Sequence, residues 1–324
     1  MDPPPVAHRQ SPEAAIISQA QSVLRWGPTA RDLLTAAPRG RVLAVMSQAV
    51  YLECESGEIV WLTTDAAPMH WRALVLDPPL SQPSAEAPFA ALAAGIGFDD
   101  GVTVGWNQAE LWQPPAIAGG ETEGLPPRLR ALRPAIEALP EPKGFGVLLG
   151  PIVDDALSLA AHSPAATEDR VLRQALPAIL AVRDSLHQGD LDGALAWAEP
   201  LLGLGEGLTP SGDDFVGGLL FGFAMLHAFD PALPCFSPEA LDRFLATARR
   251  RTHRISHALL RDHAVGHASE PLHQYLAALL SGESLPSLQR WSRTAIQIGH
   301  STGWDTFSGL WTALAAIVHT SGHP

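Results

Sequence analysis

Three aspartates in two glycine-containing segments are the residues of this chain best suited to chemistry. The first segment, residues 203–214, reads GLGEGLTPSGDD and ends in the adjacent carboxylates Asp213 and Asp214. The apolar run 215–229 follows at once and predicts a buried helix. A glycine-rich loop that leads into a helix leaves backbone N–H groups unpaired at the positive end of the helix dipole. The segment therefore predicts an anion site, in which the two carboxylates are ligands for a metal ion or a substrate.

A second segment near the end of the chain repeats this pattern. Residues 302–310 align with residues 211–219 as [Ser/Thr]-Gly-x-Asp-x-x-x-Gly-Leu, with an offset of 302 − 211 = 91 residues. Asp305 then corresponds to Asp214. If a pseudo-twofold axis brings the two helix starts together, their amides and hydroxyls face one anionic ligand. The two aspartates would hold a divalent cation there or orient a substrate amide.

The same alignment pairs Gly218 with Gly309, each about one helical turn after its aspartate. Glycine at these positions predicts that another helix approaches closely. The alternative for Asp214 and Asp305 is that each only caps its own helix. Capping does not account for Asp213 or for the glycine density of the first segment, so we favour the functional interpretation.

A basic segment, residues 249–261, lies between the two copies in an otherwise acidic chain. We expect Arg249–Arg251 to be solvated, and Arg254 and Ser256 to reach the pocket and bind the anionic part of a substrate. Four nearby histidines form two i, i+4 pairs that lack the glutamate of a metalloprotease motif, which favours surface histidines over a zinc site. These are His253, His257, His263 and His267.

The candidate site consists of residues from these three segments. Asp213 and Asp214 are also the candidate ligands of Mg²⁺, and no complete nucleotide or flavin motif occurs. The predicted catalytic residues are Asp213, Asp214, Asp305 and Arg254. The predicted substrate- and anion-binding residues are Gly205, Glu206, Gly207, Thr209, Ser211, Gly212, Ser256, His300, Ser301 and Gly303, with the amides of Gly212 and Gly303 as donors.

The composition indicates a globular protein with a large core. Hydrophobic residues make up 46% of the 324 residues and charged residues 17%, and the net charge of −13 argues against a nucleic-acid-binding protein. The N-terminus lacks a basic region followed by an apolar run, and the most apolar stretch is short for a membrane span. We therefore expect a cytoplasmic protein with no membrane or nucleic-acid partner.

The spacing of apolar residues predicts an α+β protein. Residues 1–35 read as a helical or disordered lead, with short helices expected over 14–34. Residues 36–115 hold short β-rich runs about every ten residues, typical of an antiparallel sandwich or barrel-like domain, with a hairpin over Asn107-Gln108. A Pro/Gly-rich linker, 116–124, precedes an all-α domain, 125–324, that carries the degenerate repeat. The expected helices are 125–139, 165–187, 190–202, 213–229, 238–250, 252–266, 269–281, 285–299 and 304–319.

Three motifs together resemble the AllH-like family. They are GxGxGLTPSGDD at 203–214, TxRISxxLL at 252–260 and GHSxGxD at 299–305. The similarity extends from near Arg41 to the end of the chain, although the first part matches in strand pattern alone. The family was long known only as a domain of unknown function, and one member is taken to be a subunit of oxamate carbamoyltransferase in anaerobic allantoin breakdown.

This resemblance implies carbamoyl transfer between oxalurate and phosphate, giving oxamate and carbamoyl phosphate, in a complex of three different subunits. The partners it implies are a small anionic substrate, phosphate and the other subunits. The helix starts, Arg254 and Mg²⁺ would stabilise the developing charge. Two alternatives remain: a non-catalytic subunit that binds a ligand or scaffolds the complex, and a Mg²⁺-dependent hydrolase with two metal ions bridged by Asp213, Asp214 and Asp305.

Overall fold

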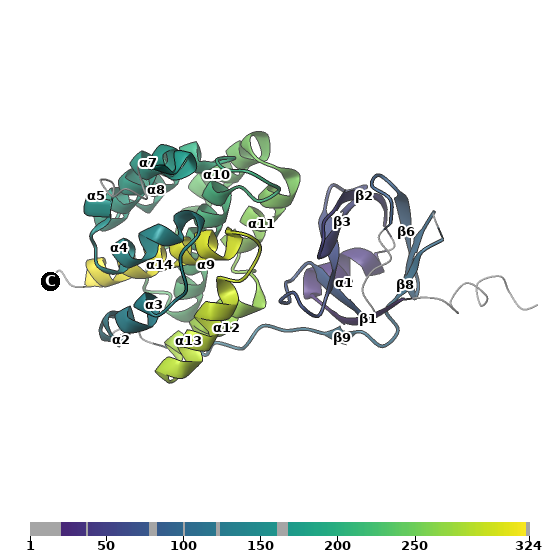
Figure 1. Ribbon diagram of the computed structural model, residues 1–324, viewed down its shortest axis with the longest axis horizontal. Helices are drawn as coiled ribbons and strands as arrows, with labels where there is room; N and C mark the ends of the chain where they lie inside the picture. Colours follow the sequence, from purple (N-terminus) through teal and green to yellow (C-terminus); the bar gives the residue numbers. More distant parts are fainter. Residues whose placement is uncertain are drawn as a thin grey trace, which may run out of the picture. The chain divides into compact units, whose positions relative to one another are not determined.

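The chain divides into two compact units, Met1–Gln113 and Pro114–Pro324. The structure is a computed structural model that describes residues 21–36, 38–77, 83–99, 101–120, 124–160 and 168–321. The first unit is a β-sheet with one helix and the second is helical, so the predicted α+β class is confirmed (Figure 1). Each unit has a hydrophobic core of its own.

The first unit is built on a nine-stranded sheet that closes on itself. The strand order is β5-β4-β3-β2-β6-β7-β8-β1-β9, and an additional pairing of β5 with β1 closes a barrel-like structure. Helix α1 (Pro28–Thr35) follows β1 and buries Ala30 and Leu34. The strands are β1 (Gln21–Trp26), β2 (Arg39–Val45), β3 (Ala49–Cys54), β4 (Ile59–Thr64), β5 (Ala73–Asp77), β6 (Pro88–Leu92), β7 (Gly95–Phe98), β8 (Thr103–Gly105) and β9 (Glu110–Leu111).

Strand β1 accounts for most of the differences from the sequence prediction. Residues 21–26 were expected to be helical, but they form a strand that pairs with β5 antiparallel and with β8 and β9 in parallel. Because β1 lies between β8 and β9, the hairpin predicted over Asn107-Gln108 is wrong. Strands β4 and β5 are also parallel, so the sheet is mixed where an antiparallel one was expected. The remainder of the predicted lead, residues 1–20, lies outside the described residues.

The second unit consists of helices, most of them at the predicted positions. Ser237 accepts a hydrogen bond from the Ala240 amide and Asp190 accepts one from Gly193, as expected of helix N-caps. The short helices η3, α4 and α5 were not predicted. The elements are α2 (Leu125–Ala131), α3 (Arg133–Glu137), η3 (Gly144–Leu148), α4 (Leu149–Val153), α5 (Leu157–Ala160), α7 (Arg170–His187), α8 (Leu191–Ala198), η4 (Glu199–Leu201), α9 (Ser211–Phe229), α10 (Pro238–Arg251), α11 (Arg254–Ala264), α12 (Glu270–Leu280), α13 (Leu285–Ala295) and α14 (Thr302–Ser321).

Helices α9 and α14, which contain the two copies of the repeat, lie side by side in the middle of this unit (Figure 1). A Cβ atom at Gly218 would overlap the carbonyl oxygen of Thr306, and one at Gly309 would overlap the carbonyl oxygen of Phe215. Phe215 and Thr306 are themselves equivalent positions of the repeat. The close helix contact predicted at the two glycines is therefore present, and it is symmetric about a pseudo-twofold axis.

Both helices start at equivalent positions, Ser211 and Thr302, which places their aspartates in the first turn. The symmetric contact at the glycines lies one turn further on, so it holds the two starts next to each other. Among the described residues, no helix is both long enough and apolar enough to cross a membrane.

Candidate functional site

Asp213 joins three separate segments at the start of α9. One carboxylate oxygen, Oδ1, accepts a hydrogen bond from the Gly203 amide at 2.9 Å. The other, Oδ2, accepts hydrogen bonds from the hydroxyls of Thr252 and of Ser256, the latter at 2.8 Å. Thr252 caps the C-terminal end of α10, and Ser256 lies in the first turn of α11. Asp213 thus connects the glycine-rich loop to the basic segment, and it does so without capping its own helix.

Asp305, in the first turn of α14, is completely buried and also bonds outside its own helix. Its Oδ1 accepts a hydrogen bond from the Phe145 amide at 2.6 Å. The preceding residue, Gly144, has a φ of +52° and lies so close that a Cβ would overlap the Asp305 carboxylate. The segment containing η3 therefore closes over Asp305. Sequence reasoning missed this partner, for which the only signal is the Gly144-Phe145-Gly146 pattern.

Hydroxyls from each repeat bond to the aspartate of the other repeat. The Ser211 hydroxyl, at the start of α9, hydrogen bonds to Asp305 in α14. The Thr302 hydroxyl, at the equivalent start of α14, hydrogen bonds to Asp214 in α9. Thr209 and Ser301 add one hydroxyl each, to Asp214 and Asp305 respectively. This crossed arrangement brings the two helix starts into one site.

The two loops also meet directly through their hydroxyls. The Thr209 and Thr302 Oγ1 atoms lie 3.0 Å apart and share a hydrogen bond. Even so, Asp214 Oδ2 and Asp305 Oδ2 are both buried with no hydrogen-bond partner among the described residues. A buried carboxylate oxygen without a partner is unfavourable when charged, so each of these atoms favours a proton, a cation or a ligand.

Burial raises the pKa values of all three aspartates. The pKa of Asp214 lies well above its ordinary value because of burial first and the neighbouring Asp305 second. The pKa of Asp305 is raised to about 6, chiefly by burial, while the Phe145 amide and the two serine hydroxyls oppose the shift. Burial also raises the pKa of Asp213, and its three hydrogen bonds oppose that shift. We therefore expect Asp214 and Asp305 to retain a proton between them near neutral pH.

Two of the predicted anion donors are engaged within their own loops. The Gly212 amide donates to the Leu204 carbonyl at 2.8 Å, and the Gly303 amide donates to the Ile298 carbonyl at 2.9 Å. A Cβ at Gly212 would overlap the Leu201 carbonyl oxygen, and a Cβ at Gly303 would overlap the carbonyl oxygen of Ala295, the last residue of α13. These glycines therefore serve loop packing, in contrast to the expectation that their amides face a ligand.

The other predicted residues differ in their exposure. Glu206, Gly207, His300 and Arg254 are exposed, and Arg254 begins α11. Ser256 is buried on Asp213. Gly205, Thr209, Ser211 and Ser301 are half-buried at the rim of the paired aspartates. The structure thus brings together Asp214, Asp305 and the loop hydroxyls around one buried centre. Asp213 is the neighbour of Asp214 in α9, and its hydrogen bond with Ser256 connects α11 to this centre.

One histidine prediction is wrong. His263 was expected on the surface, but it is buried against the backbone of Gly217 and lies near the ring of Phe221. Because Gly217 has no side chain, α9 leaves room for the imidazole. Burial lowers the pKa of His263 to about 4, so we expect a neutral ring. His253 is exposed, and His257 and His267 are half-buried.

The comparison with known families points to the same part of the chain as this site. Residues 201–314 match the family described as oxamate carbamoyltransferase subunit AllH, which confirms the resemblance inferred from the three motifs. The matched segment runs from the end of η4 into α14 and contains Asp213, Asp214 and Asp305. No solved structure matches the chain.

Proposed function

We propose that this chain is a subunit of an oxamate carbamoyltransferase-type enzyme, because a segment of its helical unit matches the AllH family. We further propose that Asp214 and Asp305 move the proton that carbamoyl transfer requires. The observation that carries this proposal is the crossed pairing of hydroxyls and carboxylates, which leaves one buried oxygen of each aspartate without a protein partner.

The reaction itself requires such a proton transfer. When a phosphate oxygen attacks the carbamoyl carbon of oxalurate, a C–O bond forms and the bond from that carbon to the amide nitrogen breaks. The products are carbamoyl phosphate and oxamate. Hydrogen phosphate loses a proton and the departing nitrogen gains one. A carboxyl group whose pKa lies near the working pH is suited to both steps, and the raised pKa of Asp305, about 6, meets this condition.

The surrounding residues would bind and orient the substrates. The hydroxyls of Thr209, Ser211 and Ser301 lie around the paired aspartates, and on substrate binding each would turn from its aspartate to donate a hydrogen bond to phosphate or to a ureido oxygen. Arg254 is the first residue of α11, and Asp213 holds this helix in place by its hydrogen bond with Ser256. The guanidinium charge of Arg254 therefore stays next to the basic segment. The positive ends of the α9 and α14 dipoles add to the attraction for an anion. The remaining subunits would complete the active enzyme.

Two alternatives follow from specific observations. The complete burial of Asp305 favours a scaffolding subunit, in which the paired aspartates only hold α9 against α14. The buried oxygens Asp214 Oδ2 and Asp305 Oδ2 would also suit a Mg²⁺ ion, since carboxylate oxygens are its usual protein ligands. In that case a Mg²⁺-dependent transfer or hydrolysis would replace proton transfer by the pair.

The test is oxalurate phosphorolysis by the full chain assembled with its partner subunits. Asp305→Asn keeps the shape and the bond from the Phe145 amide but cannot carry the proton, so we expect kcat to fall at least about a hundredfold. Asp190→Asn is the matched control, because asparagine caps α8 as well as aspartate does.

Three outcomes distinguish proton transfer by the aspartates from the scaffolding role and from the Mg²⁺-dependent reaction. Loss of activity in Asp305→Asn with intact assembly, while Asp190→Asn stays active and chelation does not change wild-type activity, supports the proposal. Unchanged kcat with intact assembly supports the scaffolding role. Activity that disappears on chelation and returns with Mg²⁺ supports the metal-dependent alternative.

A further inference from the structure

A second group of polar side chains gathers near the C-terminal end of α14, away from the aspartates. It consists of Asp155 from the turn after α4, His187 at the end of α7 and His319 in the last turns of α14. One ligand atom from each, a carboxylate oxygen or an imidazole nitrogen, lies within 4.8 Å of the other two. At 1.5 Å per residue, the 14 residues from Asp305 to His319 span about 21 Å, so this cluster is separate from the site described above.

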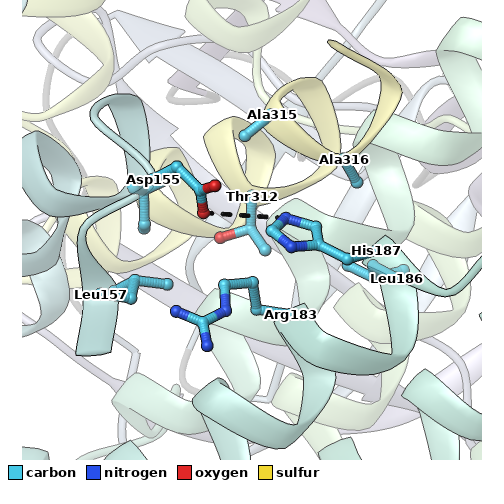
Figure 2. Close-up of a pocket in the computed structure, with 9 residues that line it drawn as sticks. Asp155, Leu157, Arg183, Leu186, His187, Thr312, Ala315 and Ala316 are labelled. Carbon is cyan, nitrogen blue, oxygen red and sulfur yellow. Dashed lines mark ion pairs between the residues drawn. The ribbon is translucent and has the colours of Figure 1, made fainter. Parts of the chain in front are cut away.

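The two imidazole rings are stacked face to face. Their centroids are 3.8 Å apart and their planes differ by 7°. His187 Nε2 lies 3.9 Å from Asp155 Oδ1, and Figure 2 shows this carboxylate directed toward the His187 ring. Three segments far apart in the sequence thus converge through metal-binding side chains.

A small pocket adjoins Asp155 and His187, as Figure 2 shows. Arg183, which also lines this pocket, donates hydrogen bonds to Asp184 and to the hydroxyl of Ser158. Asp155 has a φ of +53°, the left-handed conformation that commonly ends a helix, and the Ala156 amide donates back to the Pro151 carbonyl of α4 at 2.7 Å. The other residues that line the pocket are Ile152, Leu157, Leu186, Thr312, Ala315 and Ala316.

We propose that Asp155, His187 and His319 form a binding site for a divalent transition cation of the zinc type. Two imidazoles and one carboxylate are a common protein ligand set for zinc, and a water molecule in the pocket would supply the fourth ligand. Tetrahedral bonds of about 2.1 Å place ligand atoms roughly 3.4 Å apart, so the two stacked rings must turn out of their parallel planes for one nitrogen of each to face the ion. The bound cation would link the ends of α7 and α14 to the turn after α4.

The test uses the full chain, stripped of metal by a chelator and titrated with zinc chloride in a calorimeter. We expect one equivalent to bind and the melting temperature to rise. The double variant His187→Gln, His319→Gln should bind zinc at least about a hundredfold more weakly and lose the rise. His267→Gln, which changes a half-buried histidine outside the cluster, is the matched control and should behave like the wild type.

Asp155→Asn provides a second variant if the double variant does not fold, because Asp155 is exposed. It should weaken zinc binding about tenfold while leaving the metal-free melting temperature unchanged. Anomalous diffraction from zinc-soaked crystals should place the ion between the three side chains. Equal zinc uptake by wild type and the variants, absence of saturable uptake by the wild type, or an ion located elsewhere would overturn the proposal.

Discussion

At the scale of single residues, burial raises the pKa values of the aspartates in the candidate site. Asp305 has no exposed surface, yet within the described part of the chain its carboxylate accepts one backbone hydrogen bond together with hydroxyl contacts. Those contacts do not offset the loss of water, and the pKa rises. A charged aspartate in this position lowers the free energy of unfolding, and functional sites commonly carry such a loss of stability.

The raised pKa of Asp305 gives a pH dependence whose sign can be worked out. The folded pKa, about 6, exceeds the unfolded value of 3.8, so the folded state binds the proton more tightly. This stabilising contribution is complete below about pH 4 and is lost as the pH rises through 6. In Asp305→Asn this dependence should disappear. Relative to wild type, the variant should gain up to about 3 kcal/mol in the free energy of unfolding between pH 4 and pH 8.

Chemical denaturation of both proteins at several pH values measures this difference. In the comparison of the two proteins, titrating groups that do not interact with Asp305 cancel, whereas Asp214, whose pKa Asp305 raises, adds to the difference. If the difference in unfolding free energy stays constant from pH 4 to pH 8, Asp305 does not have the raised pKa inferred from its burial.

Asp213 should affect stability more than binding. Asp213→Ala leaves the Gly203 amide and the Thr252 and Ser256 hydroxyls without their acceptor in a buried place. We expect a loss of about 2–4 kcal/mol in the free energy of unfolding, measured by urea denaturation. Asp192→Ala, which removes an exposed aspartate bonded to Ser237, should cost less than about 1 kcal/mol. Equal losses in the two variants would contradict the linking role of Asp213.

The sequence identified the aspartates and the hydroxyls of this site because glycine, hydroxyl and carboxylate recur there in a fixed order. It could not identify Phe145, whose contribution is a backbone amide from a residue 160 positions before Asp305. A main-chain donor leaves no side-chain pattern. For the same reason the sequence could not reveal that the Gly212 and Gly303 amides bond within their own loops.

At the scale of elements, the packing of α9 on α14 depends on two glycines. Gly218→Ala and Gly309→Ala each place a Cβ against a backbone carbonyl of the facing helix, which cannot move aside as a flexible side chain would. We expect each substitution to cost about 3 kcal/mol or more in the free energy of unfolding. Gly150→Ala in α4 is the matched control, because no atom lies within 4 Å of its added Cβ.

The control substitution should be neutral or slightly stabilising, since alanine favours a helix more than glycine does. Thermal or urea denaturation of the three variants makes the comparison. If Gly218→Ala and Gly309→Ala behaved like Gly150→Ala, the close helix contact, and with it the joint site, would be wrong.

The success of the sequence prediction for these elements varied with the strength of the local signal. Most long helices were found because apolar periodicity and caps such as Ser237 and Asp190 mark them. Strand β1 was missed because its partners are distant in sequence: residues 75–77, 104–105 and 110–111. Its pairing depends on tertiary contacts that six residues alone do not show.

At the scale of the whole molecule, the two units have separate cores. The barrel-like core draws on residues between Val23 and Leu111, and the helical core on residues between Ile117 and Val318. We therefore expect residues 114–324 to fold without the first unit. Circular dichroism of this fragment should show helical signal and one cooperative thermal transition. A fragment that lacked this transition would show that the helical core is incomplete alone.

The α+β class followed from composition and periodicity, because the change from strand spacing to helix spacing near residue 115 is strong. The family match spans residues 201–314 and so lies wholly in the helical unit. The closed order of the sheet could not be predicted, since it depends on the pairing of β1 with β5. The pseudo-twofold arrangement of α9 and α14 could be predicted, because the repeat that produces it is visible in the sequence.

We expect the two glycine-aspartate helix starts to form one site in which Asp214 and Asp305 act as a unit. A double-mutant cycle on oxalurate phosphorolysis by the assembled enzyme tests it most directly, with Asp214→Asn, Asp305→Asn and the combined variant. We predict that each single substitution lowers kcat at least about a hundredfold and that the combined variant loses no more than the worse of the two. If the two losses multiplied, Asp214 and Asp305 would act independently, and if the single variants kept full activity, neither aspartate would take part in the reaction.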